Sequence, residues 1–279
     1  MANDAGNGAV KGQYATINGL NLYYEVHGEG APLVLLPGGF MTVAAMGQVV
    51  PALAQTRQVI AVELEGHGHT ALVGRLLHWE QMADDIAGLI AHLGLSQADV
   101  MGYSLGGGVA LQTAIRHPAA VRKLVLVSAP CKRDGWYPEV LAGMAAMTPE
   151  VMAATPIYEE YAGIAPKPED FATFVGSVRT LLGQDYDWSA EFVKLPMPTL
   201  IAIGDADSVR TAHAVEMFGL LGGGKADGGF NYTPTSELAI LPGVTHFTIL
   251  TYMISPPRLD LMLPILTSFL DAPLPAVSE

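Results

Sequence analysis

The chain has 279 residues, of which 50% are hydrophobic and 15% charged, so it can bury a sizeable core as one large domain or two small ones. Its formal net charge of −13 disfavours binding to nucleic acid and to anionic membrane surfaces. The single cysteine, Cys131, excludes an internal disulfide, no Cys/His cluster has metal-site spacing, and no apolar run reaches the roughly 18 residues of a membrane span. Residues 1–12 lack the apolar stretch of a signal peptide, so we expect a cytoplasmic protein.

The first part of the chain predicts strands separated by glycine-rich turns and one helix. The expected elements, in order, are a β-hairpin of residues 14–17 and 20–26 that turns at Asn18-Gly19, a buried strand at 32–36, a helix over 43–54 and a second buried strand at 58–64. The loops after the two buried strands read Pro37-Gly38-Gly39 and Glu65-Gly66-His67-Gly68.

From residue 79 onward, the pattern alternates between helices and buried strands. The expected elements are a helix at 79–93 that stops at Gly94, a strand at 98–101, a helix at 107–116, strands at 124–127, 198–203 and 237–241, and a closing amphipathic helix at 258–270. Such alternation predicts an α/β fold with a mostly parallel central sheet flanked by helices. Residues 222–232 are rich in glycine and predict a mobile surface loop.

Residues 131–194 interrupt this alternation, because they contain helical stretches without a clear strand. We expect them to form a helical cap inserted into a core domain made of residues 1–130 and 195–279. The segment is rich in aromatic residues and methionine, which pack in ordinary cores as readily as they line a substrate pocket. Met144, Met147 and Tyr158 are the pocket candidates from the cap.

The sequence Gly102-Tyr103-Ser104-Leu105-Gly106 lies between an expected strand and an expected helix. In this context a Gly-x-Ser-x-Gly segment forms a tight turn from which the serine hydroxyl projects, and the flanking glycines let the strand and the helix pass each other. A serine hydroxyl is a poor nucleophile unless a base takes its proton and a third group orients that base. Two later strand-end loops supply such groups, Gly204-Asp205-Ala206-Asp207 and Pro242-Gly243-Val244-Thr245-His246.

These motifs resemble those of α/β-hydrolases of the esterase and lactonase type, over nearly the full length of the chain. Two further segments carry the same resemblance, Leu35-Leu36-Pro37-Gly38-Gly39 and Gly66-His67-Gly68-His69-Thr70. The resemblance implies an α/β-hydrolase fold with a helical cap and a catalytic triad of Ser104, Asp207 and His246. In the family's Gly-x-x-Asp pattern the second aspartate orients the histidine, which favours Asp207 over Asp205. Some members take the acid from the loop after the preceding strand, where the first carboxylate here is Asp134.

The same resemblance implies an oxyanion hole formed by two backbone N–H groups. One is that of Leu105, and the other belongs to Gly39, with Phe40 as the alternative. The family usually has His-Gly where this chain has Pro37-Gly38, and relatives often have aspartate at the position of Glu63. Phe40 and Tyr103 are further candidates for the pocket, although Tyr103 has packing as an equal alternative.

We therefore expect a serine hydrolase that cleaves carboxylic esters with an apolar acyl group through an acyl-enzyme, without a cofactor or metal. Lactones, including N-acyl homoserine lactones, are the second substrate class, and cofactor-free haloperoxidases and C–C bond hydrolases share the triad. A non-catalytic ligand receptor on the same scaffold is the alternative outside enzymes. The expected partner is a small-molecule substrate, and the sequence leaves the natural substrate and the oligomeric state open.

Overall fold

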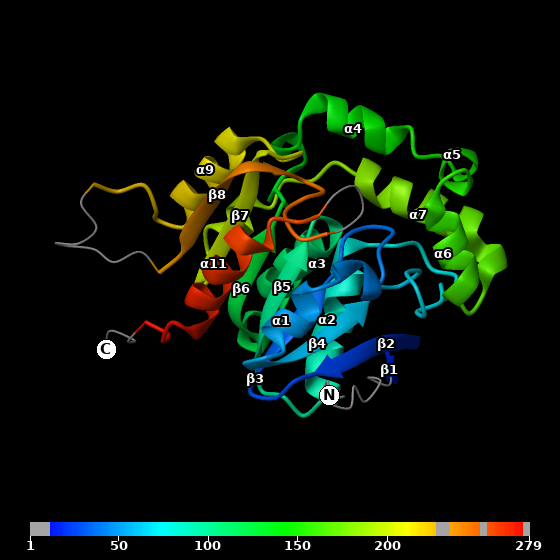
Figure 1. The fold of residues 1–279 in the computed structure, drawn as a ribbon, viewed down its shortest axis with the longest axis horizontal. Helices are drawn as coiled ribbons and strands as arrows, with labels where there is room; N and C mark the ends of the chain where they lie inside the picture. Colours follow the sequence, from blue (N-terminus) through cyan, green and yellow to red (C-terminus); the bar gives the residue numbers. More distant parts are fainter. Residues whose placement is uncertain (1–11, 227–234, 252–255, 276–279) are drawn as a thin grey trace, which may run out of the picture.

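The computed structural model describes residues 12–226, 235–251 and 256–275. Among these, eight strands form one sheet in the order β1-β2-β4-β3-β5-β6-β7-β8 (Figure 1). The strands are β1 (Gln13–Ile17), β2 (Leu20–His27), β3 (Ala31–Leu36), β4 (Arg57–Glu63), β5 (Ala98–Tyr103), β6 (Val121–Val127), β7 (Thr199–Ala206) and β8 (Glu237–Thr245). The pairs β1/β2 and β2/β4 are antiparallel and the other pairs are parallel, so the expected mostly parallel sheet is confirmed.

Alternating side chains of the strands bury against helices on the two faces of the sheet. The helices of the core are α1 (Val49–Leu53), α2 (Trp79–His92), α3 (Leu105–Arg116), α9 (Thr211–Leu220) and α11 (Leu259–Asp271). On β3, Val34 and Leu36 belong to the apolar cluster that contains α2, α3 and α9, whereas Leu33 and Leu35 belong to the cluster that contains α1 and α11. This period of two, with both sets fully buried, explains why the strand is a continuous apolar run in the sequence.

The sequence patterns also anticipated most turns, with one correction. The hairpin turns at Asn18 and Gly19, both with positive φ, and Gly94 with φ of 70° follows the end of α2. The helix expected over residues 43–54 is instead a 3-10 turn at Ala44–Met46 followed by the short α1. The expectation was wrong because Gly47, with φ of 50°, breaks the helical path between them. The glycine-rich segment at 222–232 lies largely outside the described residues.

Residues 131–194 contain helices between β6 and β7. They are α4 (Pro138–Ala145), α5 (Pro149–Ala153), α6 (Pro156–Ile164), α7 (Phe171–Gly183) and α8 (Ser189–Phe192). The first three begin with proline, whose fixed φ and missing N–H suit the first helical position. Figure 1 shows α4 to α7 at the top and upper right, beside the sheet rather than on its faces.

Side chains join these helices to the core loops. The Thr42 hydroxyl donates to Glu160 Oε1 on α6 over 2.7 Å. The ring of Phe174 on α7 packs edge-on against Phe40 and His67, with centroids 5.4 Å and 4.8 Å away.

Candidate active site

Ser104 occupies a strained turn between β5 and α3, with φ of 54° and ψ of −118°. A Cβ on Gly102 would lie 2.1 Å from the carbonyl oxygen of Gly106, and one on Gly106 would lie 2.3 Å from that of Pro37. Both distances are too short for any side chain, so these two glycines are what allow the strand and the helix to approach. The positive φ at a non-glycine residue is the kind of backbone strain that is retained at functional sites.

Three side chains that are far apart in the sequence meet at this turn. His246 Nε2 lies 3.0 Å from Ser104 Oγ, and His246 Nδ1 lies 2.9 Å from Asp207 Oδ1. Ser104 comes from the turn after β5, Asp207 from the loop after β7 and His246 from the loop after β8. The parallel strands end at one edge of the sheet, which is why these loops are neighbours.

Asp207 is buried and held by several donors. Its side chain is fully buried, and it accepts hydrogen bonds from the Ser128 hydroxyl at 2.6 Å and from the N–H groups of Gly204 and Val209 at 3.1 Å. Burial alone would raise the pKa of Asp207, but the hydrogen bonds, that with His246 foremost, outweigh it and hold the pKa below its ordinary value. The carboxylate is therefore ionised at neutral pH.

The other two candidate acids lie elsewhere. Asp205 is exposed and accepts one hydrogen bond from the Gly243 N–H. Asp134 is 69% exposed and forms ion pairs with Lys132 and Arg210. Neither carboxylate takes part in the hydrogen bonds of His246.

Tyr103 positions His246 as well as lining the cavity described below. Its buried hydroxyl donates to the carbonyl oxygen of His246 over 2.7 Å, and the two ring centroids are 5.2 Å apart. Trp136 and Phe247 place their rings edge-on to the imidazole at 5.8 Å and 5.3 Å. The imidazole is thus enclosed by aromatic rings, and its side chain is only 10% exposed.

The loop after β3 lies against the first residue of α3. A Cβ on Gly39 would lie 3.3 Å from Leu105 Cδ1, and Phe40 has a φ of 62°, in the left-handed region. Leu105 is the first residue of α3, so its N–H has no acceptor within the helix. The loop after β3 therefore places Gly39 against the side chain of Leu105, at the start of α3.

A largely apolar cavity of about 420 Å³ opens at Ser104 and His246. Of the expected pocket residues, Phe40, Tyr103, Met144 and Met147 line it. Tyr158 is not among its lining residues, because the residue is 41% exposed and its ring packs against Phe171 of α7. The cavity also receives side chains that the sequence analysis did not single out, namely Met41, Val140, Met152, Ile157, Leu182, Ser208 and Phe247.

Sequence reasoning also missed the roles of Ser128 and Glu63. Ser128 directly follows β6, and a polar residue at the carboxyl end of a strand next to the aspartate loop was the available signal. Glu63, at the end of β4, is buried and accepts from the N–H groups of Val43 and His69 and contacts His69 Nδ1 at 2.9 Å. It thereby ties the glycine-rich loop after β4 to the segment that follows the Gly39 loop.

A cysteine, a histidine and a carboxylate also lie in a row where the segment 131–194 begins. Cys131 Sγ is 3.7 Å from His213 Nε2, and His213 Nδ1 is 2.9 Å from Glu216 Oε2. However, Cys131 is fully buried, and burial raises the pKa of its thiol to about 11. A thiol with this pKa is protonated at neutral pH, and the protonated form is a poor nucleophile.

Within the described ranges, no group of three or more His, Cys, Asp or Glu side chains could hold a metal ion. In the same ranges, no helix has the length and apolar character needed to cross a bilayer.

Comparison with known proteins identifies the fold. Residues 31–158 match a family model described as the alpha/beta hydrolase fold. The chain is 38% identical over 133 residues to pimeloyl-acyl-carrier-protein methyl ester esterase of Aeromonas hydrophila, covering 44% of this chain and 50% of that protein. It is 38% identical over 104 residues to 2-hydroxymuconate semialdehyde hydrolase of Pseudomonas sp., covering 36% and 37%. The chain thus spans half or less of the length of these curated relatives.

The likeness in three dimensions extends over nearly the whole chain. The crystal structure of E-2-(acetamidomethylene)succinate hydrolase superposes with a TM-score of 0.71 at 21% identity, covering 94% of this chain and all of that one. The resemblance to α/β hydrolases seen in the sequence is therefore confirmed, and so is the fold.

Proposed function

We propose that this α/β hydrolase is a serine esterase in which Ser104 is the nucleophile, His246 the base and Asp207 the orienting acid. The observation that carries the proposal is the unbroken chain of contacts from Ser104 Oγ through both nitrogens of His246 to Asp207. An ionised Asp207 can only accept, so the Nδ1 proton lies between the two residues and Nε2 is left free to take the serine proton.

The reaction then follows from these positions. Ser104 attacks the ester carbonyl while His246 takes its proton, and the proton is returned to the departing alcohol. Water, activated by the same imidazole, releases the acid from the acyl-enzyme. The N–H of Leu105 and that of Gly39, with Phe40 as the alternative, hold the oxyanion; losing one such donor costs about 3 kcal/mol in typical enzymes.

The cavity favours neutral esters with an apolar acyl group. Its lining in the described part of the chain includes methionine, valine, leucine, isoleucine and aromatic side chains but no lysine or arginine. We propose that residues 131–194 form a cap that contributes Val140, Met144, Met147 and Leu182 to this lining. A lactone presents the same carbonyl and is the second substrate class.

The named relatives and the contact between Ser104 and His246 bear on the remaining alternatives. One relative is named for the hydrolysis of a semialdehyde and another for a methyl ester, so C–C bond hydrolysis stays within reach of the same triad. The contact between Ser104 and His246 favours turnover over a receptor role, because a receptor has no need of a base beside a serine hydroxyl.

A panel of p-nitrophenyl esters of rising chain length and several lactones tests the proposal. We expect the highest kcat/KM for a medium-length acyl chain, and a loss of several orders of magnitude in Ser104→Ala. Ser177→Ala is the matched control, because that hydroxyl donates to the Thr173 carbonyl on an exposed part of α7. Tight saturable binding of the esters without turnover would instead favour a receptor.

A further inference from the structure

Ester hydrolysis changes the charge of the molecule in the cavity. A neutral ester and water yield an alcohol and an acid, and the acid loses its proton near neutral pH because carboxylic acids have pKa values of about 4 to 5. A carboxylate is poorly solvated among apolar side chains that offer it no cation. The proposed reaction therefore produces an anion in a cavity whose described lining contains no lysine or arginine.

A second hollow, of about 450 Å³, lies against the same wall. It is lined from α4 by Leu141, Met144 and Ala145, and from α7 by Arg179 and Leu182, among others. Met144 and Leu182 line both this hollow and the catalytic cavity. The two spaces therefore share the side chains of one residue of α4 and one residue of α7 as part of their walls.

The charged side chains that line the second hollow are Arg133 and Arg179, and no acidic side chain is among its described lining residues. Arg133 Nε is buried without a hydrogen-bond partner, and neither guanidinium belongs to an ion pair within the described residues. The pKa of Glu150 is lowered chiefly by its hydrogen bond with Thr148 and only slightly by the charge of Arg179, and Glu150 and Arg179 form no ion pair within the described residues. In a chain of net charge −13, two arginines without an ion pair around one hollow of mixed polar and apolar lining offer a site for an anion.

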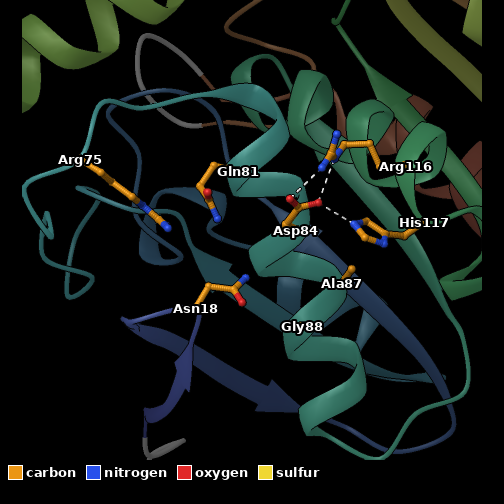
Figure 2. Close-up of a pocket in the computed structure, with 8 residues that line it drawn as sticks. All are labelled: Asn18, Arg75, Gln81, Asp84, Ala87, Gly88, Arg116 and His117. Carbon is orange, nitrogen blue, oxygen red and sulfur yellow. Dashed lines mark hydrogen bonds and ion pairs between the residues drawn. The ribbon is translucent and has the colours of Figure 1, made fainter.

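A comparison within the molecule supports this interpretation. Figure 2 shows another hollow with two arginines, Arg75 and Arg116, in which Asp84 accepts hydrogen bonds from Arg116 and His117. Arg75 is likewise paired with Glu65 and Asp85. Acidic side chains of the protein already neutralise these two guanidinium groups. The hollow in Figure 2 therefore does not favour an added anion, whereas the hollow at Arg133 and Arg179 does.

We propose that the hollow between α4 and α7 binds the carboxylate of an aliphatic acid, the product class of the proposed esterase reaction, on which this assignment rests. Arg133 and Arg179 bind the carboxylate, for which the planar guanidinium is the best-matched donor. The aliphatic chain lies against Leu141, Met144 and Leu182. The site gives the acid a place outside the catalytic cavity that neither the neutral ester nor the alcohol would prefer.

Calorimetric titration of decanoate into the Ser104→Ala protein tests the assignment without turnover. We expect saturable binding that weakens by at least about tenfold in Arg133→Gln/Arg179→Gln, since charge-assisted hydrogen bonds are lost. Arg116→Gln, whose arginine is already paired with Asp84, should bind decanoate as before. Decanol should bind equally well with and without the two arginines.

Other results would overturn the site. Unchanged decanoate affinity in the double variant excludes the arginines as ligands, and an equal loss of decanol binding shows that the substitutions merely disturb apolar packing. Decyl phosphate that binds more than about tenfold tighter than decanoate assigns the site to a phosphate and overturns the product assignment. If the double variant melts early, the exposed Arg179→Gln alone provides the same comparison.

Failure of this proposal is distinct from failure of the proposed function. Decanoate binding is measured on a protein that cannot turn over, whereas ester hydrolysis is measured on the unmodified chain. Arginine-dependent decanoate binding in a chain that cleaves no ester would refute the esterase and with it the product role. An active esterase with arginine-independent decanoate binding would refute the site alone.

Discussion

Asp207→Asn should abolish most of the turnover while leaving the fold intact. The carboxylate is buried and accepts from four donors, of which His246 Nδ1 and the Ser128 hydroxyl are side chains. An amide of the same size cannot accept at both positions, so one of its N–H bonds faces a donor or the imidazole takes the wrong tautomer. In serine triads this change costs about 10⁴-fold in kcat, or about 5.5 kcal/mol in the barrier.

Asp205→Asn is the matched control, two residues away in the same loop. Asp205 is exposed and accepts a single hydrogen bond from Gly243, which an amide oxygen can also accept. We expect less than about a threefold change in kcat, which is under 1 kcal/mol. The assay is kcat for p-nitrophenyl butyrate with thermal unfolding measured alongside. A larger loss in Asp205→Asn than in Asp207→Asn would refute the choice of acid.

Three further outcomes are expected. Met144→Ala should change the ratio of kcat/KM between long-chain and short-chain esters by up to about 200-fold. Tyr158→Ala, which lies outside the cavity, should leave this ratio unchanged. An equal effect of Met144→Ala on all esters would contradict the cavity assignment. Burial lowers the pKa of His67 from 6.5 to about 4. The buried neutral imidazole therefore contributes its full stability above pH 6.5, and this contribution is lost as the pH falls toward 4, because the unfolded chain binds the proton first. In urea unfolding, the free energy of unfolding of the unmodified chain should fall over that window by about 3 kcal/mol more than that of His67→Gln. Cys131, with its raised thiol pKa, should react with Ellman's reagent only after unfolding, and rapid reaction of the folded protein would show that the site is open.

Much of the fold was predictable because local chemistry and the global arrangement agree. The run at β3 is apolar on both faces since both faces are covered, and the glycines around Ser104 mark the only residue type that the close approach of β5 and α3 allows. Where local signals compete, prediction fails. Residues 43–54 carry helical periodicity, but Gly47 takes a positive φ that splits the helix.

The site was predictable as far as it depends on motifs at strand ends. Ser104, Asp207 and His246 lie in such loops, so their meeting follows from a parallel sheet. The contact of Ser128 with Asp207 and the composition of the apolar cavity wall depend on how separate segments pack. No local sequence pattern predicts such packing. Tyr158 shares helix α6 with Ile157, which lines the cavity, but its ring packs against Phe171. A step of one residue rotates a helical side chain by about 100°, enough to change which side it contacts.

The most direct test of the central claim is labelling with a fluorophosphonate followed by mass mapping of the modified peptide. We expect stoichiometric modification of Ser104, the residue whose Oγ lies 3.0 Å from His246 Nε2, and no labelling of Ser104→Ala or of the denatured chain. Modification of another serine, or ester hydrolysis by Ser104→Ala at the rate of the unmodified protein, would contradict it.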